Sequence, residues 1–124
     1  MSKIFFLFVS SLLIAQNSQA VILARCSGMK LPNGISYSFE LVQEADAENV
    51  LKSRVEVYSQ DTAVAPVKHF ATERCQAFWM EEQILVCNTI YETQYRVDPI
   101  TKTAEEVYEG EASLYDTCTF PDTK

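Results

Sequence analysis

Short segments in which hydrophobic and polar residues alternate fill most of this chain. The clearest segment runs from Ile35 to Leu41, where every second residue is apolar, so a strand here would bury one face and expose the other. The preceding Pro32-Asn33-Gly34 is typical of a tight turn, because Pro fixes φ while Asn and Gly tolerate positive φ. We therefore expect residues 21–31 to form the antiparallel partner of this strand.

The same alternation predicts further strands downstream. In the stretch 44–52 the residue types also suit a short helix, but a loop followed by a strand is favoured. Turn residues such as Asp98-Pro99 and Glu109-Gly110-Glu111 separate the later segments. The predicted later strands cover residues 51–59, 70–80, 83–87, 91–97, 103–108 and 112–120.

This pattern predicts an all-β fold of about seven or eight short antiparallel strands. Connections are short throughout, which favours a meander arranged as a small barrel or a sandwich. A covalent bond between the first and last strands would favour a closed or nearly closed barrel, because it would hold the two edges side by side.

The first twenty residues differ from the rest and are interpreted as a secretory signal peptide. Lys3 precedes an apolar run from Ile4 to Ile14, and the small residues Ser18 and Ala20 occupy the positions a signal peptidase requires. This run is too short for the ~30 Å hydrocarbon core of a membrane. We expect cleavage after Ala20, leaving one domain of residues 21–124, exported to the periplasm or the medium and with no membrane span.

All four cysteines lie in the predicted mature domain and are expected to form two disulfides, because an exported protein meets an oxidising compartment. Cys75 and Cys87 flank a predicted hairpin whose turn lies near residue 81, which would place them opposite each other. That pairing leaves Cys26 with Cys118. A zinc site is disfavoured, because the closest cysteines are 12 positions apart and the chain has a single His.

The charge of the chain excludes some partners and favours others. Ten Lys and Arg against 17 Asp and Glu give a formal net charge of −7, which argues against binding to nucleic acid. Acids gather in two places, at Glu44, Asp46 and Glu48 and in a second cluster of Glu105, Glu106, Glu109 and Glu111. The first is interpreted as a solvated loop, with a weak cation site as the less favoured alternative, because it lacks the glycine and final Glu of a calcium loop. The second could attract a basic partner.

Catalytic motifs are absent from the sequence. There is no G-x-S-x-G, H-E-x-x-H, P-loop or G-x-G-x-x-G, and His69 follows a Pro-containing loop, as a surface or strand-end histidine does. An acid–base pair of carboxylates could be formed only across a cleft, which a domain of this size rarely offers. We therefore expect no enzymatic activity, no cofactor and no metal.

Aromatic residues are the other notable component. Tyr37, Phe39, Tyr91 and Tyr95 fall on predicted buried faces.

Phe78 and Trp79 are adjacent, so they must point to opposite faces of a strand. Trp79, Tyr58 and Tyr115 are the candidates for outward-facing aromatics. Together with the second acidic cluster they form the predicted interaction surface.

These features favour an exported, non-catalytic binding or inhibitor module for a basic exported protein. In size, predicted export, acidity and terminal cysteines the chain is similar to the small periplasmic lysozyme-inhibitor barrels, whose target is strongly cationic. It lacks the short Ser-Gly-containing loop followed by Arg-Tyr that those proteins use against the enzyme, so it is not assigned to them. The alternatives are a barrel that carries a small apolar ligand and, less favoured, a weak hydrolase.

Overall fold

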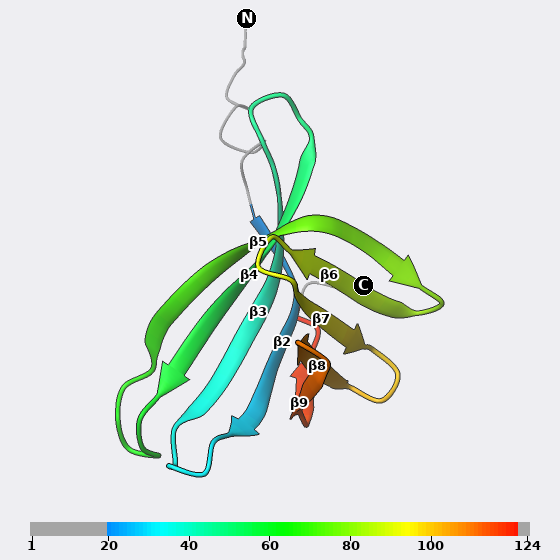
Figure 1. The fold of residues 1–124 in the computed structure, drawn as a ribbon. Coiled ribbons are helices and arrows are strands. Elements are labelled where there is room, and N and C mark those ends of the chain that lie inside the picture. The colour runs from blue at the N-terminus through cyan, green and yellow to red at the C-terminus, as the bar shows by residue number, and fades with distance from the viewer. Residues whose placement is uncertain (1–19, 122–124) are drawn as a thin grey trace, which may run out of the picture.

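A computed structural model describes residues 20–121, and all regular structure within that range is β-strand. Figure 1 shows the strands in chain order. Their bounds are β2 (Ala20–Lys30), β3 (Ser36–Ala45), β4 (Leu51–Gln60), β5 (Lys68–Glu81), β6 (Ile84–Thr89), β7 (Thr93–Asp98), β8 (Thr103–Tyr108), β9 (Glu111–Tyr115) and β10 (Thr117–Thr119). The predicted leader lies outside the described residues apart from Ala20, and no helix within them could span a membrane.

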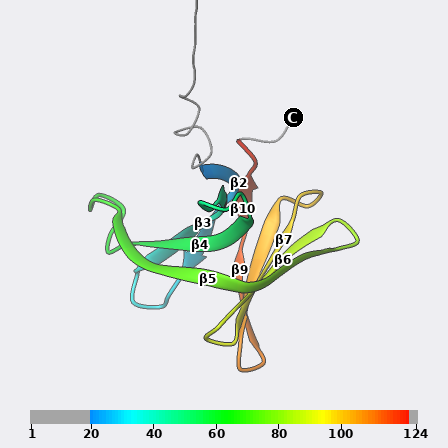
Figure 2. The same ribbon diagram turned by 90° about the horizontal axis from the view of Figure 1, so that it is seen from above.

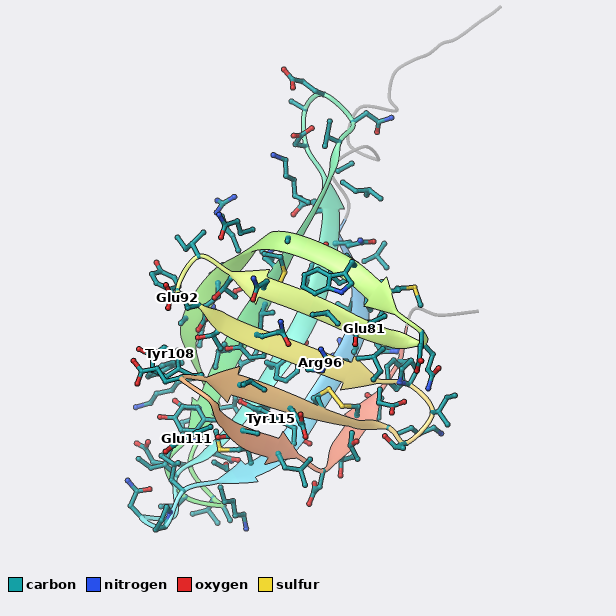
Figure 3. The ribbon with its side chains drawn as sticks, turned by 45° about the vertical axis from the view of Figure 1, so that its right-hand side comes forward. Glu81, Glu92, Arg96, Tyr108, Glu111 and Tyr115 are labelled. Carbon is teal, nitrogen blue, oxygen red and sulfur yellow. A yellow bond between two sulfur atoms is a disulfide. The ribbon has the colours of Figure 1, made fainter. Side chains whose placement is uncertain are left out.

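The strands form one antiparallel sheet in the order β10-β2-β3-β4-β5-β6-β7-β8-β9, which curls into a nearly closed barrel. The predicted all-β meander is therefore confirmed, as a barrel. The long strand β5 belongs to both halves, because its first part pairs with β4 and its second part with β6. A register shift between Cys75 and Ala77 marks the change of partner. Figure 2 shows β5 running from one half-sheet to the other and joining them, and Figure 3 shows the β6–β9 half face-on.

A corner at Asp116 closes the barrel. The single strand expected over 112–120 is in fact two strands, since β9 pairs with β8 while β10 crosses to pair with β2. The chain therefore moves from one edge of the sheet to the other within two residues. A backbone hydrogen bond of 2.8 Å from the Cys118 N–H to the Lys102 carbonyl secures the crossing. This split adds one strand to the segments that the sequence predicts and gives the nine observed.

Aromatic side chains fill the interior of the barrel. Phe39 lies at its centre, and its ring meets the rings of Tyr95 and Tyr115 edge-to-face at centroid distances of 5.0 and 4.8 Å. All three side chains are buried, and Leu41 and Val55 pack in the same core. Edge-to-face packing is favourable because the positive edge of one ring meets the negative face of another.

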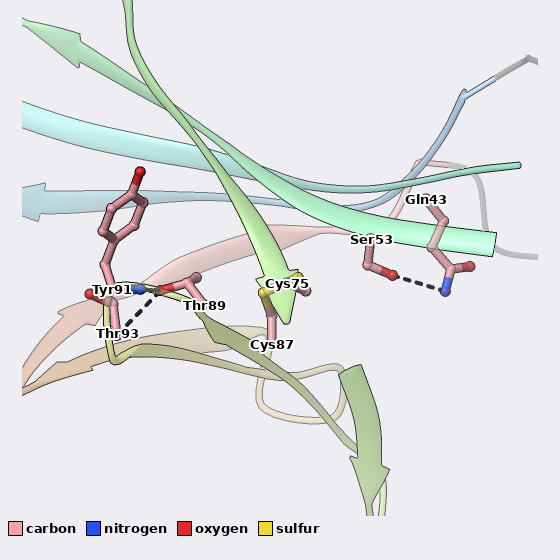
Figure 4. Close-up of a disulfide and its surroundings, with 7 residues drawn as sticks. All are labelled: Gln43, Ser53, Cys75, Cys87, Thr89, Tyr91 and Thr93. Atoms are coloured by element: carbon pink, nitrogen blue, oxygen red, sulfur yellow. Dashed lines mark hydrogen bonds between the residues drawn. A yellow bond between two sulfur atoms is a disulfide. The ribbon is translucent and has the colours of Figure 1, made fainter. Parts of the chain in front are cut away.

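Both predicted disulfides, Cys26–Cys118 and Cys75–Cys87, are present. The expected register of the second was wrong. The hairpin turns at Glu82, which has a φ of 59°, so Cys87 pairs with Phe78. Because of the register shift, Cys75 instead lies opposite Thr89, and the bond runs diagonally between β5 and β6 (Figure 4).

One side chain expected to be buried is exposed. Tyr91 was placed at the start of a strand, but it lies in the turn before β7 and is 60% exposed. The turn is closed by Thr89, whose Oγ1 accepts hydrogen bonds from the backbone N–H groups of Tyr91 and Thr93 (Figure 4). Leu51 lies at the end of the β3–β4 hairpin, which extends beyond the barrel and offers no core to pack against (Figure 1).

Candidate functional site

A row of five side chains crosses the outer face of the β5–β9 half-sheet, one from each strand. In register order they are Trp79, Val86, Arg96, Glu105 and Leu114, and we call them the Trp79 row. Val86 is completely buried although it faces outward, whereas Trp79 is 38% and Leu114 56% exposed. The two ends of the row are therefore partly exposed apolar side chains, and the charged residues Arg96 and Glu105 lie between them.

Arg96 lies at the centre of the Trp79 row and is held by its neighbours. Its guanidinium donates to the carboxylate of Glu81 at 3.4 Å and to the side-chain oxygen of Gln94 at 3.2 Å. Figure 3 shows Arg96 on the outer face of β7 with Glu81 beside it. Glu105 lies opposite Arg96 in register but has no ion pair among the described residues. Its carboxylate is thus available to a partner.

Nearly all of the net negative charge of the described residues lies in this half of the barrel. Residues 75–121 contain nine acids and two bases, Arg96 and Lys102, whereas residues 20–74 contain seven acids and six bases. The outer face of the β2–β5 half pairs many of its charges, with Arg25 on Glu40 and Arg54 between Glu44 and Glu56. The uncompensated field therefore belongs to the half-sheet that carries the Trp79 row.

The predicted interaction surface is not one surface in the structure. Trp79 and Glu105 share the outer face, as expected. Tyr115 was expected to point outward, but it is fully buried in the barrel. Its hydroxyl donates to Glu106 at 2.7 Å, so Glu106 also faces inward. This separation follows from strand geometry, because the adjacent residues Glu105 and Glu106 must point to opposite faces.

The remaining members of the predicted surface lie at other places. Glu109 occupies the β8–β9 turn with a φ of 52°, and Glu111 begins β9 beside Tyr108 (Figure 3). The Glu109 carboxylate raises the pKa of the Tyr108 hydroxyl, mainly by charge repulsion of the phenolate. Tyr58 lies on the other half-sheet, where its hydroxyl donates to Glu40 at 3.3 Å.

A second carboxyl, which the sequence analysis did not single out, also faces the interior. Glu73 lies on β5 opposite the buried Val55, and the Tyr95 hydroxyl donates a hydrogen bond to it. One carboxylate oxygen, Oε1, is buried without a hydrogen-bond partner. The available signal was the alternation Ala71, Glu73, Cys75, which places Glu73 on the inner face of its strand.

The interior carboxyls and tyrosines shift one another's ionisation. Burial raises the pKa of Glu73, and the nearby Glu106 carboxylate raises it further. Burial and the same carboxylates raise the pKa values of Tyr95 and Tyr115 far above the ordinary range. Both phenols therefore remain protonated hydrogen-bond donors at any physiological pH, and each holds one carboxyl in place.

A cluster of Glu56, His69 and Thr72 lies on the outer face of the β2–β5 half-sheet. His69 is exposed near the start of β5, as the sequence predicts, and its Nε2 lies 2.9 Å from Glu56 Oε1 and 3.2 Å from Thr72 Oγ1. Thr72 also donates to Glu56. A catalytic relay needs the acid and the nucleophile on different ring nitrogens, but here both contact Nε2. This arrangement does not activate the Thr72 hydroxyl.

The first acidic cluster forms a turn. Oδ1 of Asp46 accepts hydrogen bonds from the backbone N–H groups of Glu48 and Val50, at 2.9 and 3.0 Å. These bonds, with the one from Val50 first, lower the pKa of Asp46. Glu44 is paired with Arg54, so the three acids do not converge. No group of three or more His, Cys, Asp or Glu residues in the part of the chain described here could hold a metal ion.

Comparison with known proteins adds no relative: no family model, no curated protein and no solved structure matches this chain.

Proposed function

We propose that this chain is an exported, non-catalytic binding module for a basic protein, and that the partner docks on the Trp79 row. The observation that carries the proposal is the partition of charge, since nine acids and only two bases lie in the half of the chain that forms this face. An uncompensated negative field accelerates encounter with a cationic surface and disfavours acidic competitors.

The Trp79 row also has the side chains that a partner would use once it has docked. Trp79 and Leu114 are both partly exposed, and tryptophan is among the residues most often found at the energetic centre of interfaces. The unpaired carboxylate of Glu105 lies next to Leu114 in register and can accept a hydrogen bond from a Lys or Arg. The two disulfides are compatible with an oxidising, exported environment.

The experiment measures binding of the immobilised protein to three basic proteins, namely lysozyme, a basic ribonuclease and cytochrome c, across a salt titration. We expect binding at low ionic strength that weakens as salt rises, because the Debye length shortens to about 8 Å at 0.15 M. If none of the three binds at low ionic strength, the proposal is wrong.

Two charge-reversal variants locate the surface. Glu105→Lys reverses a charge in the Trp79 row, and Glu48→Lys makes the same change of net charge on the exposed turn between β3 and β4. We expect Glu105→Lys to weaken binding roughly tenfold and Glu48→Lys to change it little. Poly-L-lysine measures the contribution of charge alone and is expected to respond equally to both variants. Equal effects of the two variants on the protein partners would place the interface elsewhere.

A further inference from the structure

The barrel has a cavity at the end where β10 crosses to β2. It lies between the tip of the β5–β6 hairpin, the β7–β8 turn and the β10 segment, and its volume is about 1120 Å³. The interior beyond it is filled by the core aromatics, so any ligand would occupy the mouth of the barrel and not its centre. Cavities of this size bind small molecules in many proteins.

The wall of the mouth cavity is mostly apolar. It is lined by side chains from β2, the β5–β6 hairpin, the β7–β8 turn and the C-terminal segment, including Leu23, Phe78, Met80, Leu85, Pro99 and Phe120. Leu23, Phe78 and Leu85 pack against the core and form the rigid inner wall of the cavity, whereas Met80 is 61% exposed. The flexible thioether of Met80, beside this rigid apolar wall, can adapt to ligands of varied shape.

Two charged residues line the cavity, Asp116 and Lys102, and neither forms an ion pair within the part of the chain that the structure describes. Asp116 packs so closely over Gly28 that a Cβ added there would lie 1.9 Å from its Oδ1. The same Oδ1 accepts a hydrogen bond from the Thr117 hydroxyl at 3.0 Å. Lys102, on the β7–β8 turn, has no ion pair among residues 20–121. Lys102 is therefore the one cation among the lining residues of an otherwise mostly apolar cavity.

We propose that the mouth cavity binds an anionic single-chain amphiphile of the fatty-acid class, with its acyl chain against Phe78 and Leu85 and its head group paired with Lys102. Apolar contact provides affinity for the chain, and the lone cation selects the sign of the head group. This site is separate from the Trp79 row, so the proposed ligand and the proposed protein partner can be tested independently.

The head group is tested with two probes of equal chain length, dodecanoate and dodecyltrimethylammonium, by isothermal titration of the purified, oxidised protein below the micelle-forming concentration. The chain carries a net charge of −7, so non-specific adsorption would favour the cationic probe. We expect the anionic probe to bind more tightly, at one site. Equal or tighter binding of the cationic probe, or no binding of dodecanoate, overturns the proposal.

The acyl chain is tested with the series decanoate, dodecanoate and tetradecanoate. We expect affinity to increase about fourfold for each added methylene until the cavity is filled, which corresponds to the free energy of burying one CH₂. An affinity that does not depend on chain length would mean that the head group alone is bound.

Three variants connect binding to the cavity. Lys102→Gln is expected to weaken dodecanoate binding three- to fivefold, as for a partly exposed ion pair, while Lys68→Gln, with the same change of net charge outside the cavity, leaves it unchanged. Met80→Asp places a carboxylate in the wall at an exposed position and is expected to abolish binding without unfolding the barrel. If Lys102→Gln and Lys68→Gln behave alike, or Met80→Asp folds and still binds, the ligand lies elsewhere.

Discussion

Cys118 lies directly opposite Cys26 in the β10–β2 pair, with Cα atoms 4.1 Å apart, although 92 positions separate the two residues in the chain. The bond joins the two strands whose pairing closes the barrel. By contrast, Cys75 and Cys87 are only 12 positions apart and join neighbouring strands of one hairpin. The two disulfides therefore constrain very different lengths of the unfolded chain.

Removing the closing bond is expected to cost more stability than removing the hairpin bond. In the loop-entropy description, a closed loop of this length contributes roughly 4–5 kcal/mol for Cys26–Cys118 and roughly 3 kcal/mol for Cys75–Cys87. Urea denaturation of the two double Cys→Ala variants measures the difference in the free energy of unfolding. Equal losses, or a larger loss for the hairpin bond, would contradict the argument from chain length.

The cysteine pairing was predictable from sequence because it depends on few alternatives. Four cysteines allow three pairings, and a hairpin between Cys75 and Cys87 selects one of them. The register of that hairpin was not predictable, because a positive φ at Glu82 and the shift after Cys75 both depend on how β5 changes partner between the half-sheets.

The sequence alone could not predict which carboxyls face the interior of the barrel. Alternation says that Glu105 and Glu106 point to opposite faces, but it does not say which one points inward. That choice is set by the pairing of Glu106 with Tyr95 on β7 and with Ser113 on β9. Sequence therefore predicted an antiparallel β-meander, as a barrel or a sandwich, and its disulfides, while the separation of the acidic cluster required the strand register.

Gly28 is expected to tolerate no side chain. It has a φ of +102° where the register of β2 shifts, and an added Cβ would collide with Asp116. Gly28→Ala should cost roughly 2 kcal/mol or more in the free energy of unfolding, from backbone strain together with displacement of Asp116.

Gly34→Ala is the matched control for Gly28→Ala. Gly34 has a similar φ of +94°, but nothing lies within 4 Å of its added Cβ, so this variant measures backbone strain alone, about 1 kcal/mol. Thermal unfolding compares the two, and truncating the collision partner with Asp116→Ala should recover part of the loss in Gly28→Ala. Identical losses in the two glycine variants would show that the contact with Asp116 is unimportant.

The partly buried hydrogen bond from Tyr115 to Glu106 is expected to stabilise the barrel. Tyr115→Phe keeps the ring packed against Phe39 and removes only the hydroxyl, which leaves the Glu106 carboxylate without this donor. The expected cost is about 1.5 kcal/mol, the usual value for a hydrogen bond to a charged group. Tyr108→Phe, at a site 50% exposed, is the control and should change the free energy of unfolding by less than about 0.5 kcal/mol. If Tyr115→Phe leaves the free energy of unfolding unchanged, solvent replaces the hydroxyl as the donor to Glu106.

Glu73 is expected to make the barrel less stable as pH rises. Its pKa is raised in the folded protein, because burial and the Glu106 carboxylate both disfavour its charged form, and the hydrogen bond from Tyr95 only partly offsets them. The carboxyl binds its proton more tightly when folded than when unfolded. Its contribution is therefore fully present below the unfolded pKa, close to 4.5, and is lost as pH rises through the higher folded pKa.

Glu73→Gln tests this dependence, because the amide does not titrate and nearly matches the shape of the carboxyl. At pH 7 the variant should be more stable than the natural protein, by about 0.5–1 kcal/mol, a modest value since solvent screens a half-buried side chain. At pH 4 the advantage should disappear.

Glu56→Gln provides the opposite case, since hydrogen bonds from Thr72, His69 and Arg54 outweigh its burial and lower the Glu56 pKa. That variant should be destabilised at pH 7, with the difference shrinking as pH falls. A Glu73→Gln advantage that is the same at pH 4 and pH 7 would show that the carboxyl does not titrate across this window.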